Sequence, residues 1–181
     1  MRTPSPFRVL WGANALSNLA DGLVFVTLPL VAASLADDPR AVAGLATTYA
    51  LVRLVVALPV GVHVDRLDRR TLLVTANALR GIAVVALAVS LQAGAGSLVA
   101  LYAVMAVVGV LESAADGAAV AVLPSLVPRD RLDRANARIA GTQLVADEFA
   151  GPPLGGSLFA VAAALPVLAT GGLWLGAAAV A

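Results

Sequence analysis

The sequence predicts an all-α membrane protein with six transmembrane helices, and three observations carry that prediction. First, 60% of the 181 residues are hydrophobic, only 13% are charged, and the mean hydropathy is +0.93. A soluble domain is about half apolar and about a quarter charged. Second, the apolar residues form runs of about 20, the length that crosses a bilayer as a helix. Third, arginines cluster in alternate connections between those runs.

The apolar runs divide the chain into six expected helices in a single bundle, 1–181, with no soluble domain. The first begins at about Phe7 and ends before Asp37. A charged segment, 61–70, separates the second helix from the third, and a polar segment, 124–138, precedes the fifth. The sixth has about 17 residues, near the short limit for spanning, so we expect it to be cut short. The expected helices cover 7–35, 41–64, 71–93, 98–123, 139–162 and 165–181.

The arginines predict which end of the bundle faces the cytoplasm. If the helices alternate in direction, only Arg40 lies in a connection on one side, and the other side carries many arginines. Cytoplasmic connections carry an excess of basic residues, so we expect a cell-membrane protein with a cytoplasmic N-terminus. Trp11 suits the interface at that end, although packing explains it equally. The arginines expected there are Arg2, Arg8, Arg66, Arg69, Arg70, Arg129, Arg131, Arg134 and Arg138.

A polar stripe follows one face of the first expected helix. Asn14, Asn18, Asp21 and Phe25 are spaced four, three and four residues apart, so they share a face. Lipid offers polar groups no hydrogen-bond partner, so the stripe faces protein or water. It lines a substrate path, or it forms a polar contact between helices that only holds the bundle together.

Ionisable residues also lie near the middle of expected helices: Asp21, Arg53, Arg80 and Glu112. An isolated charge at that depth costs a few kcal/mol or more, so we expect pairing, first of Arg53 with Asp21 or Glu112. Asp116 follows Glu112 by four residues and shares its face. Two carboxylates on one face are candidate proton carriers, and structural ion pairs with arginine explain them equally.

The remaining composition argues against other classes of function. The net charge of +1 gives no basic surface for nucleic acid. One histidine and no cysteine leave no metal-ligand cluster. No nucleophile with a base or phosphate-binding glycine loop is present, so we expect neither an enzyme nor a cofactor, with a proton gradient as the source of energy. Acids outnumber arginines within the helices, which favours protons or cationic groups over anions.

The segment 61–70 carries the most specific motif. Its glycine, aspartate and arginines match the pattern Gly-x-x-x-Asp-Arg-x-x-Arg-Arg, which resembles the loop between the second and third helices of the major facilitator superfamily. The resemblance implies a cytoplasmic latch that biases two access states. The alternative is any tight hairpin that keeps its basic residues in the cytoplasm. The matching residues are Gly61, Asp65, Arg66, Arg69 and Arg70.

A second motif lies in the fifth expected helix, where residues 151–156 read Gly-Pro-Pro-Leu-Gly-Gly. This resembles the Gly-Pro-x-x-Gly-Gly core of the antiporter motif of the superfamily's exporters. Arg138 and Asp147 stand where its upstream glycines would fall. A generic kinked helix is the alternative, because prolines break backbone hydrogen bonds and small residues let helices approach. The resemblance covers Gly151, Pro152, Gly155 and Gly156.

Residues 18–29 and 123–136 are similar to the enterobactin-exporter-like and macrolide-efflux-like branch. Together these matches imply the N-terminal six-helix half, built as three helices and then three more, of a proton-driven exporter of a drug-like or siderophore-like small molecule that works by alternating access. A full transporter has two such halves. We therefore expect a missing second half or a homodimer as partner, besides lipid and substrate. The alternatives are an inactive truncated product and a non-transporting membrane scaffold or regulator.

Overall fold

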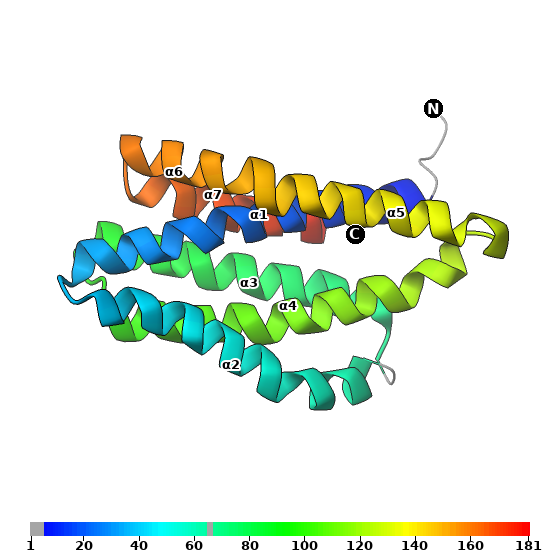
Figure 1. Ribbon diagram of the computed structural model, residues 1–181, viewed down its shortest axis with the longest axis horizontal. Coiled ribbons are helices and arrows are strands. Elements are labelled where there is room, and N and C mark those ends of the chain that lie inside the picture. Colours follow the sequence, from blue (N-terminus) through cyan, green and yellow to red (C-terminus); the bar gives the residue numbers. More distant parts are fainter. Residues whose placement is uncertain (1–5, 65–66) are drawn as a thin grey trace.

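The computed structural model describes residues 6–64 and 67–181, apart from the side chains of residues 58 and 60–64. That part of the chain is helical and without strands, which confirms the all-α prediction (Figure 1). The elements are α1 (Pro6–Leu35), α2 (Pro39–Val64), α3 (Arg69–Gln92), α4 (Leu98–Leu126), η1 (Arg129–Arg131), α5 (Leu132–Gln143), η2 (Leu144–Ala150), α6 (Gly151–Val161) and α7 (Ala164–Val180).

The largest departure from the expected bounds concerns the fifth helix, predicted at 139–162. The helix begins at Leu132, and α5, η2 and α6 continue one another as a single rod, here called the fifth rod. Its start was missed because the segment 124–138 is rich in charge. Leu132, Ala135 and Ile139 nevertheless recur at helical spacing and pack on a cluster of apolar side chains from α1, α3 and α4.

The middle of the fifth rod is a π-helical stretch, η2, placed just before the two prolines that begin α6. Pro152 has no backbone N–H, and its ring crowds the carbonyl of the preceding turn. A wider turn accommodates both effects without ending the helix. The prolines therefore account for the interruption that separates α5 from α6.

The contacts between helices follow the same pattern in two triplets of helices. The triplets are α1, α2 and α3, and α4, the fifth rod and α7. In this comparison α1 corresponds to α4, α2 to the fifth rod and α3 to α7. The contact of α1 with α7 then corresponds to that of α4 with α3, and the contact of α2 with α4 to that of the fifth rod with α1. The contact of α3 with α7 maps onto itself. This is the relation expected of three-helix repeats, which the sequence does not display.

One end of the bundle collects the charged connections. The start of α1, the end of α2, the start of α3 and the connection from α4 to α5 lie toward the same end, on the right in Figure 1. The described arginines of these segments, from Arg8 to Arg138, therefore share that end, and Arg40 begins α2 at the other. We call the first the arginine-rich end.

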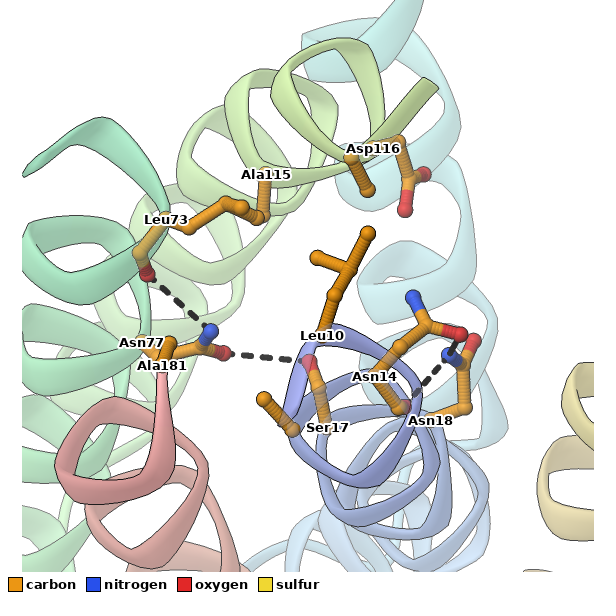
Figure 2. Close-up of a pocket in the computed structure, with 11 residues that line it drawn as sticks. Leu10, Asn14, Ser17, Asn18, Leu73, Asn77, Ala115, Asp116 and Ala181 are labelled. Carbon is orange, nitrogen blue, oxygen red and sulfur yellow. Dashed lines mark hydrogen bonds between the residues drawn. The ribbon is translucent and has the colours of Figure 1, made fainter. Parts of the chain in front are cut away.

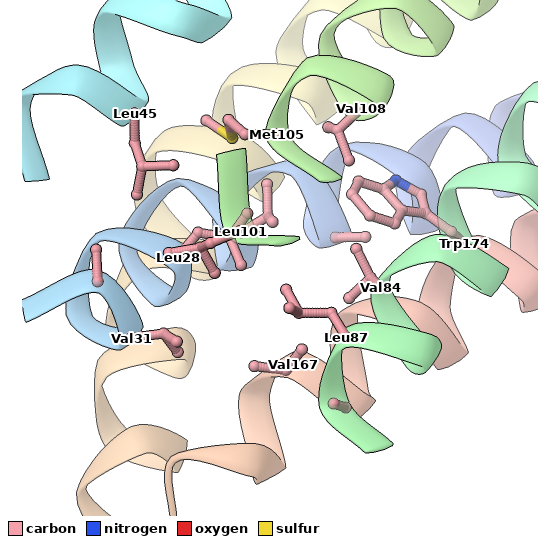
Figure 3. Close-up of a cluster of buried hydrophobic side chains, with 14 residues drawn as sticks. Leu28, Val31, Leu45, Val84, Leu87, Leu101, Met105, Val108, Val167 and Trp174 are labelled. Atoms are coloured by element: carbon pink, nitrogen blue, oxygen red, sulfur yellow. The ribbon is translucent and has the colours of Figure 1, made fainter. Parts of the chain in front are cut away.

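Apolar side chains lie both inside and outside the bundle. The inner cluster includes Leu28, Leu101 and Trp174 (Figure 3). Leu54, Val99 and Val120 are among many large apolar side chains that remain exposed. Four of the described helices, α1 to α4, are long and apolar enough to cross a membrane, and α7 is shorter. An apolar outer surface suits lipid as the surrounding solvent.

Two backbones approach closely where α1 meets the fifth rod, at Gly22 and Gly151. A Cβ atom built on Gly151 would lie 2.5 Å from the Cα atom of Gly22. One built on Gly22 would lie 2.5 Å from the carbonyl oxygen of Asp147. Because the atoms in the way are backbone, neither helix accepts a side chain there.

We expect Gly151→Ala to lower the stability of the folded protein, because the methyl group forces α1 and the fifth rod apart. Overpacking of this kind costs about 1–3 kcal/mol. Gly156→Ala is the matched control in the same motif, since nothing lies within 4 Å of its Cβ position. The measurement is thermal unfolding of both variants in detergent, and equal midpoints would refute the tight contact.

Candidate functional site

Two clusters of charged and polar side chains lie inside the bundle. The first, here the Arg80 cluster, joins α1 to α3. The Arg80 guanidinium donates to Asp21 Oδ1 at 2.8 Å, to Ser17 Oγ at 2.8 Å and to Asn77 Oδ1 at 2.6 Å. The Arg80 side chain is 1% exposed and that of Asp21 is 8% exposed. The pair is therefore sealed from solvent, and each charge has its counter-charge beside it.

Trp174 of α7 closes the Arg80 cluster from a third helix. The guanidinium carbon of Arg80 lies 4.8 Å from the centroid of the Trp174 ring, a cation–π geometry. Trp174 is itself fully buried. The cluster thus joins α1, α3 and α7.

The second cluster, here the Arg53 cluster, joins α2 to α4. Arg53 contacts Glu112 Oε1 through Nη1 and donates from Nη2 to Asp116 Oδ2 at 3.1 Å. Tyr49 donates to Glu112 Oε1 at 2.6 Å. Phe25 of α1 packs edge-on against Tyr49, with ring centroids 5.3 Å apart. This cluster is more open, because the Arg53 and Asp116 side chains are 35% and 43% exposed.

A small cavity of about 20 Å³ lies between the two clusters (Figure 2). Its walls include Ser17 and Asn77 of the Arg80 cluster and Asp116 of the Arg53 cluster. Asn14 and Asn18 line it from α1, and Asn18 donates to Asn14 Oδ1 at 3.0 Å. A volume of that size is about enough for one water molecule. The cavity is therefore bordered by members of both clusters, and Asp116 is the carboxylate that lines it.

The structure divides the predicted polar stripe of α1. Asn14 and Asn18 face the cavity, Asp21 is held by Arg80, and Phe25 is half exposed beside Tyr49. Of the two acids expected for Arg53, Glu112 is its partner and Asp21 pairs with Arg80 instead. Asp116 shares Arg53, so all five predicted charges lie in these two clusters.

The predicted loop motif is only partly described. Asp65 and Arg66 lie outside the described residues, and Gly61 belongs to the backbone of α2. Arg69 begins α3, and Arg70 Nε donates to the carbonyl oxygen of Ala181 at 2.8 Å. The latch role stays a prediction.

Asp68, which the loop motif leaves free, caps the N-terminus of α3. Its Oδ2 accepts from the backbone N–H of Thr71 at 2.7 Å. The hydrogen bonds from Thr71 lower the pKa of the Asp68 carboxyl, because they favour the charged form. An aspartate directly before a helical run is the signal that identifies such a cap.

In the fifth-helix motif, Gly151 and Gly155 face α1, whereas Gly156 has open space around it. Pro152 lies in the first turn of α6. Asp147 is half buried at the contact with Gly22, and Glu148 is exposed. Neither carboxylate forms an ion pair with any residue within the described ranges.

Four residues of the clusters were not predicted: Ser17, Tyr49, Asn77 and Trp174. Spacing offers a signal for three of them. Ser17 precedes Asp21 by four residues, Asn77 precedes Arg80 by three and Tyr49 precedes Arg53 by four, so each shares a helix face with a charge. No comparable signal points to Trp174, which meets Arg80 only through the packing of α7 on α3.

Comparison with known families decides the assignment. The model of the Major Facilitator Superfamily matches residues 10–181, nearly the whole chain. The chain belongs to the major facilitator superfamily. No curated protein matches it significantly. The superfamily predicted from 61–70 is thus confirmed, together with a membrane-embedded, transporter-type fold, and the exporter-like branch stays a prediction.

We expect Asp21→Asn and Arg80→Gln each to destabilise the protein by about 3 kcal/mol or more, because each leaves a buried charge without its partner. The double variant should cost less than the sum of the two, since it removes both charges. The measurement is a double-mutant cycle on thermal or denaturant unfolding in detergent. Additive losses would show that the pair is not coupled.

Proposed function

We propose that this chain is the N-terminal six-helix half of a secondary transporter that exports a small molecule in exchange for protons. The observation that carries the proposal is the sharing of Arg53 by two carboxylates, Glu112 and Asp116, the second of which lines the small cavity. A transporter coupled to protons needs a carboxylate that changes its charge where the change alters helix contacts. The Arg53 cluster has that property, since the contact of α2 with α4 runs through it.

In this proposal, the proton changes how Glu112 and Asp116 share Arg53. With Glu112 and Asp116 both charged, one guanidinium ties two turns of α4 to α2. Protonation of one carboxylate removes one of those charge interactions, and the arginine then depends on the other. An unpaired arginine within the membrane costs about 2.5–3.5 kcal/mol or more, so the helices must rearrange or a charged substrate group must compensate. Competition of this kind couples proton and substrate.

We further propose that the polar stripe of α1 lines the substrate path, with a drug-like or siderophore-like molecule as cargo. Asn14, Asn18 and Phe25 border that path, and Asp21, enclosed by Arg80, lies behind them. The exposed edge of the Arg53 cluster supports this proposal, because polar groups in a membrane bundle need protein or water opposite them. A second six-helix bundle, supplied by another half or another copy, covers that edge. The bundle lies in the cell membrane with its arginine-rich end toward the cytoplasm, because basic residues favour the cytoplasmic side.

We expect Glu112→Gln to abolish proton-driven export and to leave proton-independent substrate exchange intact. Glutamine keeps the hydrogen-bond acceptor for Tyr49 and Arg53 and takes up no proton at neutral pH. The measurement is transport of lipophilic dyes and antibiotics by the assembled transporter in membrane vesicles, with and without a pH gradient. Glu148→Gln is the matched control, because Glu148 is an exposed acid without an ion pair among the described residues.

The scaffold alternative gives a different result in the same experiment. If the protein only holds a bundle together, wild-type vesicles move none of the substrates and Glu112→Gln changes thermal stability alone. Loss of exchange together with loss of the pH-driven component would place Glu112 in folding or substrate binding rather than in coupling.

We expect Asp65→Asn to slow transport without weakening substrate binding, because the resemblance of 61–70 implies a latch between two access states. The measurement compares initial transport rates with equilibrium substrate binding in the assembled protein. Asp68→Asn is a control within the same loop, since asparagine also caps helices. Unchanged transport by Asp65→Asn would end the latch proposal.

A further inference from the structure

A second hollow lies on the outside of the bundle, away from both charge clusters. It is a groove of about 790 Å³ between α1, the fifth rod and the end of α7. That volume falls within the usual range of about 300–1,000 Å³ for ligand sites. Most of its walls are small or apolar, and Arg138 and Thr142 are the polar members. Representative wall residues are Gly12, Leu16, Leu19, Gly141 and Val145.

The groove lies on the side of α1 that faces away from the cavity. Gly12, Leu16 and Leu19 line the groove, whereas Asn14 and Asn18 line the cavity. At 100° per residue, the two sets lie about 140° apart around the helix. The groove therefore belongs to a different surface from the proposed substrate path.

Arg138 is held at the mouth of the groove by an aromatic contact. Its guanidinium carbon lies 5.3 Å from the centroid of the Trp11 ring. The Trp11 indole in turn donates to Thr142 Oγ1 at 2.8 Å, which ties α1 to α5. Arg138 is exposed and forms no ion pair with the residues that the structure describes. Its positive charge is thus fixed in place and free to bind an anion.

Two further arginines extend the positive charge along the same edge. Arg134 precedes Arg138 by one turn of α5, and Arg8 precedes Gly12 by one turn of α1. Both are exposed. A tryptophan beside arginines at the end of apolar helices is typical of the depth of lipid headgroups. The charged mouth and the apolar floor therefore meet at that depth.

We propose that this groove is a binding site for an anionic phospholipid of the leaflet at the arginine-rich end. The headgroup phosphate binds Arg138, and an acyl chain lies along the groove against α1. The groove runs from Ala137 to Ala150, which at 1.5 Å per residue is about 20 Å. One leaflet of hydrocarbon is about 15 Å thick, half of the roughly 30 Å core. The groove therefore accommodates a chain from the headgroup to the middle of the bilayer.

Native mass spectrometry of the detergent-purified protein tests the proposal, with phosphatidylglycerol and phosphatidylcholine of identical chains as probes. Wild-type protein should retain phosphatidylglycerol in preference to phosphatidylcholine. Arg138→Gln should reduce phosphatidylglycerol binding several-fold, because the phosphate loses its counter-charge. Arg131→Gln is the matched control, an exposed arginine of the same segment that does not line the groove.

A second variant tests the acyl-chain half of the site. Gly141→Leu places a side chain in the groove, since nothing lies within 4 Å of the Cβ position. It should reduce the binding of both lipids. Gly172→Leu, equally unobstructed and outside the groove, is its control and should bind both normally. Wild-type binding by Arg138→Gln, or by Gly141→Leu, would overturn the proposal.

A measurement on the wild-type protein tests the proposal even if the variants do not fold. The chain has two tryptophans, of which Trp174 is fully buried and Trp11 lies beside the groove. Phosphatidylglycerol with brominated chains should quench Trp11 fluorescence at a low mole fraction and in a saturable way. Brominated phosphatidylcholine should require a higher mole fraction. Equal quenching by both lipids would show that the headgroup is not recognised and would overturn the site.

Discussion

The structure depends on the need to neutralise two arginines inside a bundle whose surroundings are lipid. Arg80 is almost wholly buried and Arg53 half buried, so each requires a carboxylate within reach. The partners come from different helices, which makes each charge pair a tie between helices as well as a neutralisation. Arg80 ties α3 to α1, and Arg53 ties α2 to α4. Hydrophobic burial cannot provide these ties in lipid, where the tails are as apolar as the side chains.

A different kind of contact joins α1 to the fifth rod. Gly22 and Gly151 bring the two backbones together without side chains, and the π-helical turn beside them has already departed from regular α-helix geometry. A contact of bare backbone depends on the absence of side chains, whereas a charge pair depends on two particular side chains that meet. α1 therefore contacts α3 through the pair of Asp21 with Arg80 and contacts the fifth rod through backbone.

The sequence predicted most of the fold and about half of the site. The lengths of the apolar runs were sufficient to predict six helices, because a transmembrane helix must present an apolar surface to lipid along its whole length. They failed at residues 132–138, where charged side chains at the membrane edge hide a helix that begins early. The charged residues were identified because charge is rare within such helices. The sequence could not predict which acid pairs with which arginine. Asp21 and Glu112 are expected at similar depth, so whether each pairs with Arg53 or Arg80 depends on helix packing. Trp174 was missed for the same reason, since its role requires knowing that α7 packs on α3.

The difference in exposure between the clusters decides which is better suited to proton exchange. A proton that reaches Asp21 must displace Arg80 from a sealed site that also includes Ser17, Asn77 and the Trp174 ring. Asp116, in contrast, is 43% exposed and keeps contact with solvent, so a proton can reach this carboxylate and weaken its pairing with Arg53, the arginine that Glu112 shares. We infer that the Arg53 cluster exchanges protons and the Arg80 cluster holds the bundle in register during that exchange. The two clusters are neighbours, since Asp116, Ser17 and Asn77 line one space.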